Sequence, residues 1–298
     1  MFVQKSFAEG HEKGTLYLVA TPIGNLEDMT MRAIRTLREV DVIAAEDTRQ
    51  TRKLLTHFQI ETRLISYHEH NKFASGQEII RLLNEGTSLA LVSDAGLPAI
   101  SDPGEDLVRE AAAHRIPIVP VPGANAGLSA LIVSGLSTEC FVFRGFLPRD
   151  KKDRKAELER LNTYRETLIF YESPHRITKT LKEMEETFGN RSVVLGRELT
   201  KRYEEFVRGT IRETREFLEN QEEIRGEFTV IVEGNNKAES DEEKWWGEMD
   251  IITHVDMYIA QGKSKKEALK QTAEDRSLPK REVYNRYHQE EKHPPSRS

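Results

Sequence analysis

The sequence is poor in cysteine and in long apolar runs. Cys140 is its single cysteine, so an intrachain disulfide is excluded and a reducing compartment is expected. The apolar clusters near the N-terminus are broken by Lys5, Glu9 and Lys13, unlike the apolar core of a signal peptide. No stretch approaches the roughly 18 apolar residues that span a bilayer. We therefore expect a cytoplasmic protein that binds no membrane.

Positive charge is also scarce. The chain of 298 residues has 44 Lys and Arg against 50 Asp and Glu, a formal net charge of −6. This balance argues against a DNA partner and against binding nucleic acid over the whole surface, but it leaves room for a local basic patch. The 32% charged and 37% hydrophobic residues are typical of a globular protein, and the length predicts two domains with a small appendage.

Short apolar runs alternate with amphipathic stretches in the first half of the chain. The predicted strands are Thr15–Ala20, Val42–Ala45, Arg63–Ser66, Ser88–Val92 and Ile116–Val119. Between them, Thr30–Glu39 and Phe73–Asn84 place apolar residues at helical spacing. This alternation predicts a parallel-rich sheet with helices on both faces.

The second half predicts a mixed sheet, because adjacent strands with short turns favour antiparallel pairs. Its predicted strands are Phe141–Phe146, Thr167–Tyr171, Ser192–Leu195, Glu204–Arg208 and Phe228–Val232, with helices at Lys151–Asn162, Pro174–Phe188 and Ile211–Asn220. We place an N-terminal α/β domain at 14–137 and a C-terminal α/β domain at 138–234.

The remaining chain predicts a linker and a small helical tail. Residues 235–250 hold six acidic and two basic residues and read as an acidic linker. The tail at 251–290 predicts one helix at Ile251–Ala260, a second after Gly262-Lys263-Ser264 and a third from Pro279. Short helices with a glycine-containing turn and a proline start resemble a helix-turn-helix.

Four breaks rich in Gly, Pro and Asp follow predicted strands of the first half. They are Thr21–Asp28, Glu46–Arg49, the stretch LVSDAGLPAISDPG at 91–104, and Val121–Ala126. Because the carboxyl ends of parallel strands share one edge of the sheet, these breaks are expected to converge on a ligand site there. No GxxxxGK[ST] or early GxGxxG is present, so a phosphate loop is not indicated. The alternative is that the breaks are only tight turns.

Several motifs together carry a family resemblance. They are GTLYLVATPIGNLEDMTMRAIRTLREVDVIAAEDTRQTRKLL, SDAGLPAISDPG, VPGANA, FYESPHR and GEFTVIVEG. The chain closely resembles the bacterial small-subunit ribosomal RNA 2′-O-methyltransferases of the tetrapyrrole methylase-like, class III S-adenosyl-L-methionine (SAM) methyltransferase superfamily. The resemblance covers about residues 14–234 and, weakly, the tail to His288. Porphyrin and corrin methylases usually have a GxGxG-type loop where this chain has Thr21–Asn25.

The resemblance implies a fold, a cofactor and an acceptor. It implies two α/β domains with SAM bound in the cleft between them, and a homodimer. The acceptor it implies is the ribose 2′-hydroxyl of a decoding-centre cytidine (cytidine 1402 in the family) of 16S rRNA, with the assembled small ribosomal subunit as the expected substrate. The implied SAM-binding residues are Pro22, Ile23, Gly24, Asp94, Gly96, Leu97, Ala124, Asn125, Glu172, Ser173, Glu227, Phe228 and Thr229.

A carboxylate within reach of the hydroxyl could act as the general base. The candidates are Glu46 and Asp47 in the first half and Glu172 in the second. Each has a structural alternative: Glu46 and Asp47 could cap the helix that starts near Thr48, and Glu172 could pair with Arg176. A mechanism without a dedicated base also stays open. Asp102 could bind ligand or, like Ser101, cap the next helix. No metal site is expected, because the histidines lack a recognisable ligand spacing.

RNA contact needs cations, and three basic clusters supply them. The first is Arg49, Arg52 and Lys53; the second is Lys151, Lys152 and Arg154; the third is Lys265, Lys280, Arg281 and Arg286 in the tail. Each could instead be a solvated helix face, and the tail could serve protein docking or dimer support. Two other functions remain open: a small-molecule methylase acting on a tetrapyrrole-like ring, and a non-catalytic SAM- or RNA-binding assembly factor.

Overall fold

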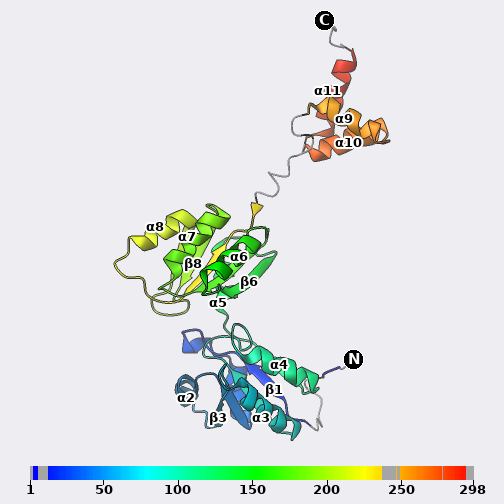
Figure 1. Ribbon diagram of the computed structural model, residues 1–298. Coiled ribbons are helices and arrows are strands. Elements are labelled where there is room, and N and C mark those ends of the chain that lie inside the picture. Colours follow the sequence, from blue (N-terminus) through cyan, green and yellow to red (C-terminus); the bar gives the residue numbers. More distant parts are fainter. Residues whose placement is uncertain (1–2, 6–12, 237–245, 247–248, 277, 293–298) are drawn as a thin grey trace. The chain divides into compact units, whose positions relative to one another are not determined.

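The computed structural model describes residues 3–5, 13–236, 246, 249–276 and 278–292. The chain forms two compact units, Met1–Asn235 and Asn236–Ser298. Both sheets belong to the first unit, and the second unit is a small helical body (Figure 1). Most of the predicted acidic linker lies outside the described residues. None of the described helices is both long and apolar enough to cross a membrane.

The first sheet is fully parallel, as predicted. Its strands are β1 (Leu16–Val19), β2 (Val42–Ala45), β3 (Arg63–Ser66), β4 (Leu89–Val92) and β5 (Ile118–Val121), in the order β3-β2-β4-β1-β5. β5 begins two residues later than predicted, because the Ile116 amide donates to Ala111 O and closes the preceding helix. As an edge strand, β3 stays partly exposed, unlike the fully buried β2 and β4.

Helices cover both faces of this sheet because alternate strand residues point to opposite sides. Val42 and Ala44 pack with α3 (Lys72–Asn84) and α4 (Gly104–Ala113), whereas Ile43 and Ala45 pack with α1 (Met31–Glu39) and α2 (Thr48–His57). A short 3₁₀ helix, η1 (Leu26–Asp28), precedes α1. The fold prediction for the first half is therefore confirmed, and each strand sends its carboxyl end to the same edge.

The second sheet is mixed, also as predicted. Its strands are β6 (Phe141–Phe146), β7 (Thr167–Glu172), β8 (Ser192–Arg197), β9 (Glu205–Thr210) and β10 (Phe228–Val232), in the order β6-β7-β10-β8-β9. Only β6 and β7 pair in parallel among them. One face packs against α6 (Lys151–Leu161), α7 (Ile177–Phe188) and α8 (Ile211–Glu219). The other face packs against α5 (Ala126–Ser134), which carries Ala130 and Leu131 into a second core.

The helical unit contains the three helices predicted for the tail. They are α9 (Ile251–Ala260), α10 (Lys265–Asp275) and α11 (Lys280–Lys292). Ser264 and Glu267 form a capping box at the start of α10. A buried cluster that includes Val255, Ala268 and Val283 joins all three helices, so the unit has a core of its own.

Candidate active site

One cavity of about 440 Å³ lies at the carboxyl edge of the first sheet. Residues from all four predicted breaks line it, and residues of the second sheet line it as well. The lining from the first sheet's loops is Ile23, Glu46, Ser93, Asp94, Ala95, Gly96, Leu97, Ile100, Ser101, Asp102, Asn125 and Ala126. The lining from the second half is Phe146, Tyr171, Glu172, Ser173, Pro174, Leu199, Lys201, Glu227, Phe228 and Thr229.

The loops after β1 and β4 are joined by backbone hydrogen bonds. Thr21 N donates to Gly96 O at 2.9 Å, and Gly96 N donates to Thr21 O at 3.1 Å. The hydroxyl groups of Thr21 and Ser93 donate to Ser93 O and Gly96 O, both at 3.1 Å. Gly96 has a φ of +82°, which a residue with a side chain rarely adopts. This glycine therefore allows the two loops to form a common wall.

The loop from Leu97 to Gly104 folds around the Asp102 carboxylate. That carboxylate accepts from Ala99 N at 2.9 Å and from Gly104 N at 2.7 Å. Pro103, rather than Ser101 or Asp102, holds the N-cap position of α4, so the predicted cap positions are corrected by two residues and one residue respectively. Asp102 nevertheless satisfies the first amide of the helix. Ala99 and Ser101 have φ values of +66° and +61°, so backbone strain is concentrated beside the cavity.

Three carboxylates, those of Glu46, Asp94 and Asp102, line the same region of the cavity. Burial, followed by the charges of Asp94, Asp102 and Asp47, raises the pKa of Glu46. Burial likewise raises the pKa of Asp102. The cavity is therefore strongly acidic and suits a ligand that carries positive charge or several hydroxyl donors.

Asp47 does not line this cavity. Its side chain caps α2 by accepting from Arg49 N at 2.8 Å and pairs with the Arg49 guanidinium at 2.9 Å. Hydrogen bonds from the Arg49 side chain and then from its backbone amide lower the pKa of Asp47 to about 2. The capping alternative thus accounts for Asp47, whereas Glu46 faces the cavity.

Glu172 lines the cavity but is held by its own neighbours. Its side chain is 1% exposed and accepts from Ser173 N at 2.8 Å and from Thr180 Oγ1 at 2.7 Å. Arg176 Nε lies 3.4 Å from a Glu172 carboxylate oxygen. This is the ion pair that the sequence predicted as the structural alternative to a catalytic role for Glu172. These contacts position the segment that joins β7 to α7.

Lys201 is a cavity residue that the sequence reasoning missed. Its ammonium lies 3.0 Å from carboxylate oxygens of both Glu198 and Glu227. A Cβ added to Gly24 would lie 2.4 Å from Lys201 Cγ, so the lysine side chain crosses directly over this glycine. Glu198 and Thr200 beside it have φ values of +51° and +65°. No local pattern marks Lys201, since its position depends on two loops far apart in the chain.

The other predicted SAM-binding residues divide by position. Ile23, Asp94, Gly96, Leu97, Asn125, Glu172, Ser173, Glu227, Phe228 and Thr229 line the cavity, whereas Pro22, Gly24 and Ala124 do not. Asn125 also caps α5 by accepting from Leu128 N at 2.8 Å. Ile100, Phe146 and Tyr171 line the cavity without having been predicted. The structure thus brings most of the predicted set together.

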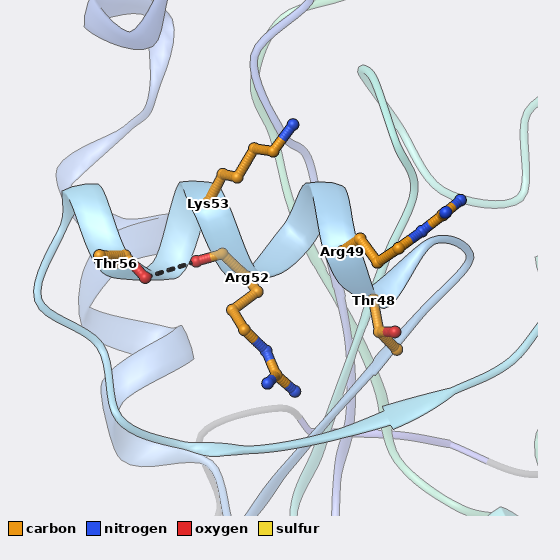
Figure 2. Close-up of a pocket in the computed structure, with 5 residues that line it drawn as sticks. All are labelled: Thr48, Arg49, Arg52, Lys53 and Thr56. Atoms are coloured by element: carbon orange, nitrogen blue, oxygen red, sulfur yellow. Dashed lines mark hydrogen bonds between the residues drawn. The ribbon is translucent and has the colours of Figure 1, made fainter.

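The cations of α2 lie along its exposed side, over a shallow hollow lined by Thr48, Arg49, Arg52, Lys53 and Thr56. Figure 2 shows Arg52 and Lys53 pointing in opposite directions from the helix. Thr56 Oγ1 donates to the backbone oxygen of Arg52 at 2.8 Å, and the Arg52 guanidinium points away from the helix. Arg49 is 87% exposed despite its contact with Asp47.

The second basic cluster needs a correction. Arg154 is 3% exposed, pairs with Glu183 and donates to Pro148 O and Arg149 O at 3.1 and 2.9 Å. A side chain buried in this way cannot contact RNA, so the predicted role of Arg154 is wrong. Lys151 and Lys152, on the same helix, are exposed.

The tail presents the third cluster on two helices. Lys280, Arg281 and Arg286 of α11 are exposed, and Arg286 lies 2.8 Å from Glu282. Lys265 Nζ lies 4.8 Å from the centre of the Tyr287 ring, which makes it a cation–π contact. Among the described residues, no group of three or more His, Cys, Asp or Glu could hold a metal ion.

Comparison with known proteins identifies the family. The profile of the Tetrapyrrole (Corrin/Porphyrin) Methylases matches residues 15–215. A Ribosomal RNA small subunit methyltransferase I of Halalkalibacterium halodurans is 58% identical over 97% of this chain and 100% of that protein. The protein of the same name from Bacillus subtilis is 56% identical over 96% of this chain and 98% of its own.

A solved structure supports the same fold. The uroporphyrin-III C-methyltransferase of Thermus thermophilus, complexed with S-adenyl homocysteine, has a TM-score of 0.53 at 19% identity. The match covers 74% of this chain and 98% of that one. The family profile and the two close relatives lead to one conclusion: the chain belongs to the tetrapyrrole methylase family and, within it, to the ribosomal RNA small subunit methyltransferase I proteins.

Proposed function

We propose that this protein transfers a methyl group from SAM to the ribose 2′-hydroxyl of a decoding-centre cytidine in 16S rRNA, acting on the assembled small subunit. The observation that carries the proposal is the acidic cavity that all four loops of the first sheet and residues of the second sheet line. The choice of ribosomal RNA as the substrate comes from the names of the close relatives. Their high identity over nearly the whole chain supports extending that substrate to this protein.

The side chains that line the cavity suit the chemical groups of SAM. SAM carries a positive sulfonium, an ammonium and two ribose hydroxyls, and the cavity offers the carboxylates of Glu46, Asp94 and Glu227. Apolar Ile23, Leu97 and Phe228 supply the walls that an adenine ring needs. The structural relative bound to S-adenyl homocysteine has the same fold.

Bound SAM supplies an electrophilic methyl group that the acceptor oxygen can attack. The protein has to align that oxygen with the methyl carbon in a cavity from which water is excluded. The hydroxyl proton passes to a base as the new C–O bond forms and the methyl–sulfur bond breaks, with S-adenosylhomocysteine as the leaving group. Glu46 is the best placed of the three carboxylate candidates, because Asp47 caps α2 and Glu172 is held by Ser173 and Thr180. Its raised pKa brings it closer to that of an effective base at neutral pH.

The basic clusters supply the contacts to the RNA backbone. Arg49, Arg52 and Lys53 project from α2, the helix that begins two residues after the cavity residue Glu46. Lys151 and Lys152 on α6 and Lys265, Lys280, Arg281 and Arg286 on the tail extend the set. The homodimer and the cytoplasmic location implied earlier remain part of this proposal.

The test is transfer of labelled methyl from SAM to small ribosomal subunits from a strain that lacks this gene, with wild-type subunits as the control. The product is mapped by resistance to alkaline cleavage, which a 2′-O-methyl group confers. We expect label at one cytidine of the deficient subunits only. Label at another atom or base would reject the assigned acceptor. SAM binding without any label would favour a small-molecule acceptor or a non-catalytic assembly role.

A further inference from the structure

Phe146 is an exposed aromatic residue at the edge of the cavity. It ends β6, lines the cavity and is 53% exposed. Phe228 lines the same cavity but is 3% exposed. This contrast places Phe228 in the interior and Phe146 at the mouth. Phe146 is therefore a large aromatic side chain that combines contact with water and a place in the lining of the acidic cavity.

The backbone around Phe146 is specifically shaped. The pairing of β6 with β7 shifts register between Phe143 and Gly145, and Gly145 has a φ of +68°. A Cβ added to Gly145 would lie 2.8 Å from Ser101 Oγ, in the strained loop of the first half. Bulges of this kind redirect a side chain next to many active sites. Here the bulge determines which way the next residue, Phe146, points.

Neighbouring groups hold this segment in place. The Phe146 ring centre lies 5.7 Å from that of Tyr171 at an interplanar angle of 64°, and Tyr171 Oη accepts from Gly127 N at 3.1 Å. Behind Phe146, Arg176 donates to Leu147 O at 3.2 Å, and Arg154 donates to the two carbonyls that follow. The ring is therefore presented on a pre-organised support.

Cations follow directly in the chain. Arg149 is exposed, Asp150 caps α6, and Lys151 and Lys152 are exposed in its first turn. An aromatic ring at a cavity mouth with cations a few residues away can bind a single-stranded nucleotide in two ways. The ring stacks on the flat π face of the base, and the cations contact the negatively charged phosphates.

We propose that Phe146, supported by Tyr171, is the platform on which the base of the acceptor nucleotide stacks. This inference rests on the proposed function and assigns a positioning residue within it. Stacking on Phe146 holds a base at the mouth while its ribose enters toward Glu46. Because every base has a π face, the platform orients the acceptor without selecting its identity. The exposed position at the mouth favours the acceptor base over the adenine of SAM, which needs the enclosed interior near Phe228.

The test compares Phe146→Ala, Phe146→Leu and Phe146→Tyr with Phe141→Ala. Phe141 lies in the same strand and is 39% exposed, but it does not line the cavity. Each variant is assayed for kcat/KM on unmodified small subunits at saturating SAM, and for SAM affinity by calorimetry. We expect Phe146→Ala to lower kcat/KM by about 5- to 150-fold with SAM affinity unchanged. Phe146→Leu should fall comparably, whereas Phe146→Tyr and Phe141→Ala should stay within about threefold of wild type.

Two results would overturn the inference. Full activity of Phe146→Leu would mean that apolar bulk, not stacking, is required. A loss of SAM affinity in Phe146→Ala, with kcat/KM restored at saturating SAM, would assign the ring to the donor. The proposed function fails in a different way, since the wild-type protein itself would then bind SAM without labelling any subunit.

Discussion

Replacing Arg154 with alanine should destabilise the second half of the first unit strongly. The Arg154 side chain is 3% exposed and pairs with Glu183, with a second contact at 2.8 Å. It also donates to the carbonyls of Pro148 and Arg149. Truncation would leave one partly buried carboxylate and two carbonyls without their donor. Breaking a buried pair in this way costs about 3–5 kcal/mol. We expect about 3 kcal/mol, because Glu183 is 17% exposed and can recover some water.

The assay is urea unfolding followed by far-ultraviolet circular dichroism, with Lys155→Ala as the matched control. Lys155 lies on the same helix and its ammonium lies 3.7 Å from a Glu159 carboxylate oxygen, but the two side chains are 71% and 59% exposed. An exposed pair contributes about 0–1 kcal/mol, so the control should unfold close to wild type. Adding Glu183→Ala to Arg154→Ala should recover part of the loss, since the stranded carboxylate is then removed.

The opposite pattern would refute this reasoning. If Arg154→Ala unfolds like wild type while methyl transfer to ribosomal subunits falls, the side chain contacts RNA as the sequence suggested. If Arg154 is a structural residue, Arg154→Ala lowers the free energy of unfolding. Any loss of methyl transfer then results from displacement of the segment that carries Phe146.

Three further predictions concern charge and close packing. Hydrogen bonds from Arg160, then Arg144, lower the pKa of Glu157 to about 2 from 4.5. The stabilisation by Glu157 is therefore present above pH 4.5 and lost as pH falls toward 2; a melting-temperature difference from Glu157→Gln that persists at pH 2 would contradict this. Glu46 must be ionised to act as a base, so kcat/KM should rise as the pH increases through the raised pKa of Glu46. Glu46→Gln should lower kcat by about 10²- to 10⁴-fold and abolish that rise. An unchanged pH profile in the variant would show that Glu46 is not the base. Gly24→Ala would place a Cβ 2.4 Å from Lys201 Cγ, so the substitution should displace the Lys201 side chain and weaken SAM binding about tenfold in calorimetry; unchanged affinity would show that the position of Lys201 does not matter for SAM binding.

The sequence predicted the local and periodic features of the fold well. β2, β3, β6 and β10 begin and end where their apolar runs do. The convergence of the four loops could be predicted because parallel topology alone brings the carboxyl ends together. β5 was misplaced because apolar Ile116 belongs to the turn that closes α4, a distinction that composition does not carry.

The site was predicted less completely, for reasons that depend on distance in the chain. Lys201 and Phe146 reach the cavity through contacts with Gly24 and Tyr171, which no local pattern reports. Arg154 is a different case, because a signal was present. It lies four and seven residues before the buried Leu158 and Leu161, which places it on the inner face of α6. The prediction grouped Arg154 with the neighbouring lysines by charge and did not consider this helical spacing.

The order of strands in the first sheet has a consequence for biosynthesis. β1 precedes both β4 and β5 in the chain, yet it lies between them in the sheet, with Leu16 paired to Leu89 on one side and Ile118 on the other. Neither neighbour exists until much later in translation. Such long-range parallel pairing is slow, because the chain between the partners must be ordered first. The nascent apolar strand LYLV therefore stays without its partners until Val121 has emerged, and this half of the enzyme completes its central sheet only after most of its helices have been made.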